Sequence, residues 1–377
     1  MSTDVKSFRD LVAEVQEKGI CGKCGGCLAF CSAGEFHALL AGADGTPVLA
    51  DESKCLHCGI CYLICPQIKV LDQELRQKTG WKPPIGPLRE IASARARSPK
   101  VRRVATDGGV VTALLTYALR KQIIQAAIVS RGVGPLAREP MVATSPDELI
   151  DAAGSHFDES QNIHALGQEY STFSPGVREV KSLGQRDLHR IALVGTPCQV
   201  FTIRKMQLLN VLPADSIVLT IGLFCMENFA FGAKTRRALE KKLSVKLGQI
   251  RKLNVKDDIV VTTAKKETIH IPFSVMDEFA RPACFACTDF ANEYADLSCG
   301  GVGSPDGYTT AVLRTTVGEA LYNRAKEDGA IEELHYRSPD QARSAASVMM
   351  AKIVAATRRK QARAAARHGE CSTRMGA

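Results

Sequence analysis

Two stretches near the beginning of the chain decide the fold of its N-terminal part: CGKCGGCLAFC at residues 21–31 and CLHCGICYLICP at residues 55–66. Each has the spacing C-x2-C-x2-C-x3-C, and the second is closed by Pro66. In bacterial ferredoxins such a run gives three thiolates to one 4Fe-4S cluster and the fourth to a second cluster. We therefore expect two clusters, one bound by Cys21, Cys24, Cys27 and Cys65 and the other by Cys31, Cys55, Cys58 and Cys61.

The competing interpretation of these cysteines is structural zinc. Zinc sites usually join two C-x2-C pairs that lie far apart in the sequence, and two tandem four-cysteine runs fit that pattern poorly. The chain has 14 cysteines in 377 residues. Disulfides are rare in a reducing compartment, so this number also favours metal or redox chemistry.

Length and composition indicate a globular protein of two or three folded units. The mass is 40.7 kDa, and 45% of the residues are hydrophobic. No apolar run approaches the roughly 18 residues of a membrane span, and the polar start is unlike a secretory signal, so we expect a cytoplasmic protein without a membrane span. The net charge of +9 favours an anionic partner, but 6% aromatic residues without a basic and aromatic patch disfavour nucleic acid.

Four further cysteines are dispersed: Cys198, Cys225, Cys284 and Cys287. Their spacing alone favours buried cysteines that pack as small hydrophobic residues. Cys198 and Cys225 nevertheless follow apolar runs that are typical of buried parallel strands, and residues at the carboxyl ends of such strands converge. For Cys299 and Cys371 we expect an inert packing residue and an exposed thiol in the tail.

The pattern along the chain predicts five segments. They are an amphipathic helix over 1–16, a ferredoxin-like domain with two 4Fe-4S clusters over 17–66, a helix and linker over 67–100, an α/β domain over 101–335, and a basic helix and tail over 336–377. Within the α/β domain we expect strands at 126–130, 191–194, 217–223 and 259–263, and helices after Gly109 and near 198–209 and 229–243. Ser338 and Pro339 are typical of a helix start.

One dinucleotide-binding motif is a false lead. Residues 132–137 read GVGPLA and match G-x-G-x-x-A after a strand. Pro135 makes an immediate helix unfavourable, so we expect no Rossmann site there.

Several motifs together resemble the coenzyme F420 hydrogenase/dehydrogenase beta-subunit family. They are VGTPCQ (194–199), GLFCMENF (222–229), CFACTDFANEYADLSCGG (284–301) and VGSPDGYTT (302–310), and the resemblance extends from residue 17 to about residue 330. It implies an α/β flavin-binding domain, a mixed sheet with flanking helices, with an N-terminal α+β ferredoxin-like two-cluster insert. It also implies bound FAD and coenzyme F420 as the substrate.

The resemblance assigns roles to individual residues. It implies that Cys198, Cys225, Cys284 and Cys287 bind a third 4Fe-4S cluster. The family's flavin loops fall on Asp107, Gly108 and Gly109 and on Gly154, Ser155 and His156. An aspartate replaces the usual small hydroxyl residue and would repel a flavin phosphate, which leaves the N–H groups of Gly108, Gly109 and Val110 as the anion binders.

Other polar residues keep two interpretations each. Thr196, Gln199 and Asn228 flank cluster cysteines and either hydrogen-bond flavin or sulfur or cap strand ends. The basic end of the last helix either meets an anionic carrier, docks an acidic partner or is solvated. No side chain is predicted to act as an acid or base, because hydride transfer at a flavin requires none.

We therefore expect an oxidoreductase subunit that passes electrons between reduced coenzyme F420 and iron–sulfur clusters. The partner would be a hydrogenase, formate dehydrogenase, heterodisulfide reductase or membrane dehydrogenase. Two alternatives stay open: a ferredoxin-dependent flavin reductase of another organic substrate, and an adaptor subunit that conducts electrons without flavin catalysis.

Overall fold

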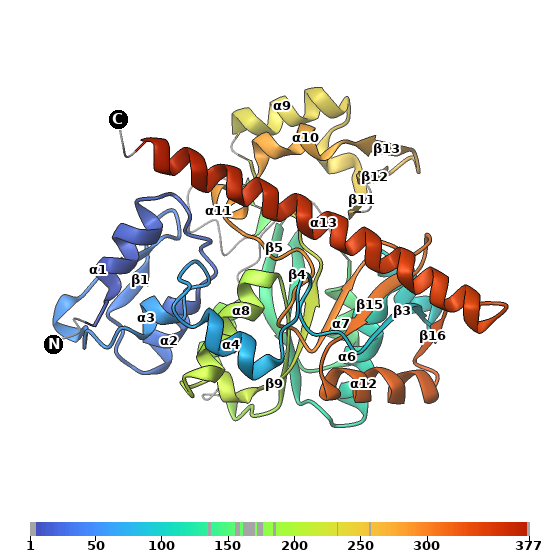
Figure 1. Ribbon diagram of the computed structural model, residues 1–377, viewed down its shortest axis with the longest axis horizontal. Helices are drawn as coiled ribbons and strands as arrows, with labels where there is room; N and C mark the ends of the chain where they lie inside the picture. Colours follow the sequence, from blue (N-terminus) through green and yellow to red (C-terminus); the bar gives the residue numbers. More distant parts are fainter. Residues whose placement is uncertain are drawn as a thin grey trace.

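The protein is represented by a computed structural model that describes residues 5–134, 137–154, 159–160, 170–171, 176–183, 186–231, 233–255 and 258–374. A small cysteine-rich unit lies beside a larger α/β unit, and one long C-terminal helix crosses the α/β unit (Figure 1). Among the described residues, no helix is both long enough and apolar enough to cross a membrane.

The cysteine-rich unit repeats one local structure twice. Each cysteine run places a left-handed glycine, Gly25 (φ 87°) or Gly59 (φ 74°), directly before a short helix. The elements are α1 (Phe8–Leu11), the π-helix η1 (Val12–Gln16), α2 (Gly26–Ala33), the hairpin of β1 (Leu39–Ala41) and β2 (Pro47–Leu49), η2 (Glu52–Lys54) and α3 (Ile60–Leu63). The predicted first helix begins at Phe8 because the Ser7 side chain caps it, and its second half widens into the π-helix. Residues 1–4 of that prediction lie outside the described residues.

The segment predicted as a helix and linker contains a strand of the main sheet. Helix α4 (Asp72–Thr79) is present, but β3 (Glu90–Ala96) pairs with β15 and β16. The α/β unit therefore begins near Glu90 and not at residue 101. The alternation of small apolar residues in β3, with Ala92, Ala94 and Ala96 buried, carries too little hydrophobic contrast for the sequence to reveal it.

The main sheet has nine strands in the order β16-β3-β15-β14-β9-β8-β4-β5-β6. Its centre, β14-β9-β8-β4, is parallel, and β15, β3 and β16 pair antiparallel to their neighbours. At the other edge β5 pairs antiparallel to β4 and parallel to β6. The further bounds are β4 (Ala126–Gly134), β5 (Ala137–Ala143), β6 (Glu159–Ser160), β8 (Ile191–Gly195), β9 (Ile217–Leu223), β14 (Leu297–Gly300), β15 (Thr309–Leu313) and β16 (Ile331–Glu333). The mixed sheet agrees with the predicted fold class. Gly132 and Gly134 of the GVGPLA motif lie in β4, and the next element is the strand β5 and not a helix.

Helices cover both faces of this sheet. On one face α6 (Val110–Arg120) and α12 (Thr316–Glu327) pack in one apolar core with Leu219 and Ile221 of β9. On the other face α8 (Pro197–Leu208) packs with Ile191 and Leu193 of β8 and with α2. Shorter pieces are α5 (Pro99–Val104), α7 (Pro146–Asp151), η4 (Gly176–Ser182) and η6 (Ala214–Ser216).

A second sheet lies outside the main one. The strands β11 (Ile250–Val255), β12 (Ile259–Thr263) and β13 (Thr268–Ile271) form a separate antiparallel sheet, so the predicted strand at 259–263 belongs to it. The strands β7 (Tyr170–Ser171) and β10 (Ala230–Phe231) pair as a two-stranded antiparallel sheet. The helices of this part of the chain are α9 (Ala233–Leu243), η7 (Leu247–Gln249), α10 (Phe273–Met276), η8 (Asp277–Phe279) and α11 (Pro282–Phe285).

The C-terminal helix α13 (Pro339–Arg374) is 36 residues long and crosses the molecule, contacting β3 and α11 on its way (Figure 1). Pro339 is its first residue, and the Ser338 hydroxyl accepts a hydrogen bond from the N–H of Gln341 at 3.2 Å. The predicted helix start is confirmed.

Candidate functional site

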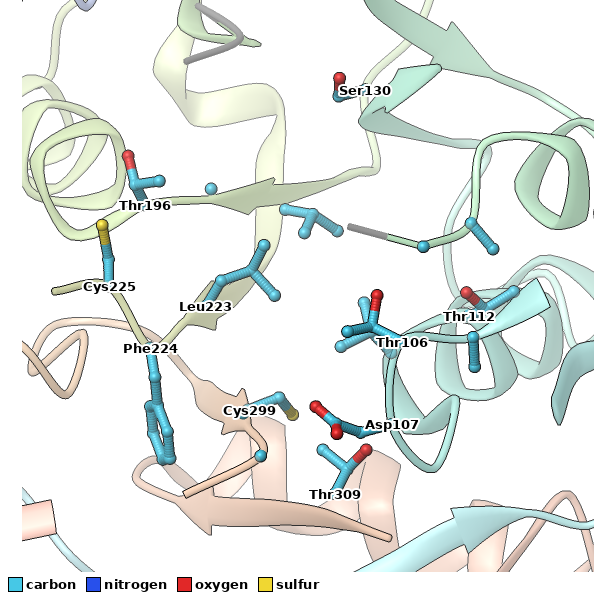
Figure 2. A pocket seen from close by; sticks show the side chains of 18 of the residues that line it. Thr106, Asp107, Thr112, Ser130, Thr196, Leu223, Phe224, Cys225, Cys299 and Thr309 are labelled. Atoms are coloured by element: carbon cyan, nitrogen blue, oxygen red, sulfur yellow. The ribbon is translucent and has the colours of Figure 1, made fainter. Parts of the chain in front are cut away.

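A cavity of about 380 Å³ lies where the parallel strands end. Its walls come from the carboxyl ends of β4, β8, β9 and β14 and from the first turn of α6 (Figure 2). Ligands in open α/β sheets bind at this edge, and pockets of about 300–1,000 Å³ suit small molecules and cofactors. The cavity thus has the position and size of a cofactor site.

The first wall is the loop that leads into α6. Asp107, Gly109 and Val110 line the cavity, and Gly109 (φ 76°) takes the left-handed conformation that starts the helix. Gly108 does not line the cavity, and its N–H donates to the Thr309 hydroxyl at 3.0 Å. The Gly108 N–H is thus hydrogen-bonded within the protein, and its predicted binding of an anion stays a prediction. The open donors of a helix start are those of the first turn, here Val110, Val111 and Thr112, which all line the cavity.

The second predicted flavin loop is only partly described. Gly154 lines the cavity with φ 102°, whereas Ser155 and His156 lie outside the described residues.

Thr196, Gln199 and Asn228 line the cavity on the opposite side. Gln199 accepts a hydrogen bond from the Thr196 N–H at 2.9 Å, which caps α8, and the Thr196 hydroxyl lies 3.3 Å from the sulfur of Cys198. Asn228 donates from its backbone N–H to Cys284 at 3.4 Å and from its side chain to Cys225 at 3.5 Å. Both interpretations therefore apply in this wall: Gln199 caps a helix, and Thr196 and Asn228 contact cysteine sulfurs.

The twelve candidate ligands form three sets of electrostatic neighbours. In the first set, Cys27 lies near Cys21, Cys24 and Cys65. In the second set, Cys61 lies near Cys31, Cys55 and Cys58. In the third set, Cys225 lies near Cys284 and Cys287, and Cys287 also lies near Cys198. We call these sets the first, second and third cysteine groups. The fourth cysteine of each sequence run therefore lies with the three leading cysteines of the other run.

The three groups follow one another from the cavity outward. Cys225 lines the cavity and belongs to the third group, and Cys198 of that group neighbours Cys24 of the first. The Thr202 hydroxyl lies 3.7 Å from the sulfur of Cys24 and donates to the carbonyl oxygen of Cys198 at 2.8 Å. Cys27 then neighbours Cys61 of the second group.

This close approach needs a glycine on α2. A Cβ at Gly26 would lie 2.3 Å from the Thr202 methyl carbon, a distance that real contacts do not reach. The glycine between the cysteines of the first run thus lets α8 approach α2.

The thiols are in an environment that suits binding to a cationic centre. Burial, and then the nearby thiolates of Cys24 and Cys21, raise the pKa of Cys65 to about 12. Burial and its neighbours likewise raise the pKa of Cys27 and Cys198. Bare thiolates would therefore repel one another, whereas a metal centre releases their protons and neutralises that charge. Four thiol donors in each set fit a 4Fe-4S cluster.

Among the described residues, no three His, Cys, Asp or Glu side chains are arranged to hold a single metal ion.

The two remaining cysteines differ in what the structure says of them. Cys299, expected to be inert packing, is 1% exposed in β14, but it also lines the cavity beside Asp107 and Thr309 (Figure 2). Burial raises its pKa to about 12. No such indication was present in the sequence, because Asp296 and Ser298 interrupt the apolar residues before Cys299. The structure describes Cys371 only as part of α13.

The basic end of α13 is not simply solvated. Lys360 is 1% exposed and donates to the main-chain oxygens of Cys225 at 2.6 Å and Asp289 at 2.8 Å. Arg363 pairs with the buried Glu227 and donates to the main-chain oxygen of Met226 at 3.1 Å. Burial lowers the pKa of Lys360, but the nearby charges of Cys287, Cys225 and Cys284 outweigh it, so the pKa is raised overall.

Comparisons with known proteins agree with these features. Two family profiles of the "Coenzyme F420 hydrogenase/dehydrogenase, beta subunit" match the chain: the one for its N-terminal part matches residues 91–167, and the one for its C-terminal part matches residues 188–338. The coenzyme F420 hydrogenase subunit beta of Methanothermobacter thermautotrophicus is 33% identical over 66% of this chain and 85% of its own length. A subunit of the F(420)H(2) dehydrogenase of Methanosarcina mazei is 26% identical over 85% of this chain and 87% of its own.

A solved structure is also similar. A chain of the F420-reducing [NiFe] hydrogenase complex from Methanosarcina barkeri aligns with a TM-score of 0.60 and 28% identity, covering 72% of this chain and 91% of that one. The first profile begins at residue 91, in agreement with β3 as a strand of the α/β unit. The chain therefore belongs to the coenzyme F420 hydrogenase/dehydrogenase beta-subunit family and is an oxidoreductase subunit.

Proposed function

We propose that this chain binds FAD in the cavity and a 4Fe-4S cluster at each of the three cysteine groups, and passes electrons between coenzyme F420 and a partner enzyme. The observation that carries the proposal is the double position of Cys225, which lines the cavity and belongs to the third group. An electron leaving the cavity therefore has a cluster site in its wall.

The bound flavin would supply the exchange between hydride transfer and single-electron transfer. The protein's part is to hold it. The first turn of α6 lines the cavity, and a helix start suits a phosphate, while the apolar Leu223 and Phe224 at the end of β9 suit an aromatic ring system (Figure 2). The helix start thus fits the phosphates of FAD, and the apolar residues fit its ring system.

The order of the groups gives a direction in space. The third group is at the cavity, the first is next to it, and the second contains Cys58, which is exposed. Leu56 of the same cysteine run is 65% exposed. We place the exit toward a partner subunit at Cys58, because electron transfer between proteins needs a cluster close to the surface.

The direct test uses protein purified without oxygen and loaded with FAD, iron and sulfide. Reduced F420 is the donor, and a viologen dye is the acceptor. We expect FAD to be released on denaturation, iron and sulfide in equal amounts, and steady reduction of the dye. Zinc in place of iron, with no flavin bound, would remove the proposal.

The same assay separates the alternatives. Dye reduction or flavin reduction by reduced ferredoxin, without a response to reduced F420, would favour a ferredoxin-dependent reductase of another substrate. Clusters without bindable flavin would favour an adaptor subunit.

A further inference from the structure

Helix α13 lies beyond both family profiles. It begins at Pro339, and the second family profile ends at residue 338. The helix nevertheless reaches the third cysteine group, where it contacts α11, the short helix that contains Cys284. Its contribution to that group must be read from its own residues.

Lys360 is the residue of α13 that approaches the cysteines. Its side chain is 1% exposed, and its ammonium group donates to the carbonyl oxygen of Cys225 and to that of Asp289, two residues after Cys287. Both acceptors are uncharged. The carboxylate of Asp289 accepts instead from the N–H groups of Asn292 at 2.7 Å and Glu293 at 3.0 Å.

Neighbouring residues of α13 hold this position. Arg363, one turn later, pairs with Glu227 and with Asp277 and lies over the ring of Phe285. Arg359 lies over the ring of Phe273. These contacts fix the helix against the segment that carries Cys225 and against the segment between Cys284 and Cys287, so the Lys360 ammonium has one defined place.

A buried lysine is costly unless negative charge compensates it. Lys360 is held at the third cysteine group by its hydrogen bonds to the main-chain oxygens of Cys225 and Asp289. The negative charges around it are those of the Cys287, Cys225 and Cys284 thiolates together with the carboxylates of Asp289 and Glu227. A 4Fe-4S cluster with four thiolate ligands is anionic, and the uptake of one electron makes it more negative by one charge. A fixed cation therefore favours the reduced form, and net charge near a cluster is a known determinant of its potential.

From this geometry we propose that Lys360 is a positioning residue whose fixed charge raises the reduction potential of the third cluster. The inference rests on the proposed function, because it needs a cluster at that group. The step concerned is the transfer of one electron from the reduced flavin to the oxidised cluster. The electron stays on the cluster until the first cluster accepts it, and no proton or bond to the protein changes.

The test compares four full-length proteins loaded with FAD and clusters: wild type, Lys360→Gln, Lys360→Arg and Arg358→Gln. Arg358 is exposed on the same helix, so its variant removes an equal charge without touching the cysteines. Iron content is measured first, and cluster potentials follow from a redox titration monitored by electron paramagnetic resonance. The signal of the third cluster is identified as the one that Cys198→Ser abolishes.

We expect Lys360→Gln to lower the one-electron reduction equilibrium constant of the third cluster at least tenfold, which is about 59 mV. Lys360→Arg keeps the charge, so it should shift the reduction potential of the third cluster by less than half of that amount. Arg358→Gln should leave this potential unchanged. The signals of the other two clusters should not move in any variant.

Three results would overturn the inference. The first is a wild-type potential in Lys360→Gln with full iron content. The second is a shift in Lys360→Arg as large as that in Lys360→Gln. The third is loss of the third cluster from both Lys360 variants, which would show that the side chain acts by packing. If only Lys360→Gln loses the third cluster, a wild-type potential of that cluster in Lys360→Arg supports the role of the positive charge at this position. A wild-type protein without clusters would instead remove the proposed function itself.

Discussion

The ammonium group of Lys205 donates a hydrogen bond of 3.0 Å to the main-chain oxygen of Cys65. Lys205 lies on α8, the helix that begins beside Cys198, and its side chain is 0% exposed. It also donates to the carbonyl of Ile68 and pairs with Asp72 at 3.3 Å. One buried cation thus joins the α/β unit to the end of the second cysteine run.

Replacing Lys205 by methionine should therefore loosen the two units from each other. The change takes one of two donors from the carbonyl oxygen of Cys65, removes the lysine donor of the buried Ile68 carbonyl and leaves Asp72 without this cation. We therefore expect a loss of about 2 kcal/mol in the free energy of unfolding. Urea unfolding followed by the visible absorbance of the clusters measures it. Lys69→Met is the matched control, since Lys69 is exposed near the same segment. Equal free energies of unfolding for Lys205→Met and Lys69→Met would contradict the role given to Lys205.

The crossed arrangement of the first two cysteine groups predicts which substitutions act on the same cluster. Cys65→Ser should alter the same resonance signal as Cys21→Ser, although Cys65 lies in the other sequence run. Each substitution should lower the iron content by up to about one third. If Cys65→Ser instead alters the signal that Cys55→Ser alters, each run binds its own cluster and the assignment is wrong.

Cys299 provides a control for that series. It is buried and lines the cavity, but its sulfur belongs to none of the three cysteine groups. We expect Cys299→Ser to retain the full iron content and all cluster signals, with changes confined to the flavin spectrum. A loss of iron comparable with that of Cys198→Ser would show that Cys299 is a ligand.

Asp107 should weaken the binding of FAD. Its carboxylate lies at the cavity beside the first turn of α6, where a phosphate is expected to bind (Figure 2). Removal of a like charge at a helix start is worth about 0.3–1 kcal/mol, so Asp107→Asn should tighten FAD binding about two- to fivefold. Quenching of FAD fluorescence by the flavin-free protein gives the dissociation constant. Asp147→Asn, at an exposed helix start, should change nothing. Weaker binding by Asp107→Asn would mean that the carboxylate bonds the flavin.

Glu293 should make stability depend on pH. Burial, and then the charge of Asp289, raise its pKa from 4.5 to about 8, while the hydrogen bond from the Trp81 ring N–H at 2.6 Å opposes the shift. The folded protein therefore keeps a proton that the unfolded chain loses near pH 4.5. This contribution to stability is complete below pH 4.5 and is lost as the pH rises through about 8.

The measurement is the midpoint of thermal unfolding between about pH 6 and pH 9. Wild type should lose stability more steeply over this range than Glu293→Gln, which keeps an oxygen for Trp81 but cannot ionise. Glu327→Gln, at an exposed site on α12, should follow wild type. Parallel curves for wild type and Glu293→Gln would show that Glu293 does not titrate in this range.

Much of the local structure could be predicted because short-range chain geometry determines it. The left-handed Gly25 and Gly59 lie between closely spaced cysteines, and the β9 strand agrees with its apolar run at 217–223. The start of α13 at Pro339 follows from the residue types at that point. The strands β14 and β15 were not predicted, because their buried residues continue without the alternation that marks a strand with one solvent-exposed face.

The sequence by itself determined two ferredoxin-like cysteine runs, an α/β unit after them and the convergence of Cys198 and Cys225 at strand ends, since each of these depends on residues close together in the chain. Only the tertiary structure decided that Cys198 lies beside Cys24, that β3 belongs to the main sheet and that Lys360 reaches Cys225. Those contacts join residues more than a hundred positions apart or elements of weak pattern. They arise from the packing of apolar faces such as those of α8 and α2, which no local spacing encodes.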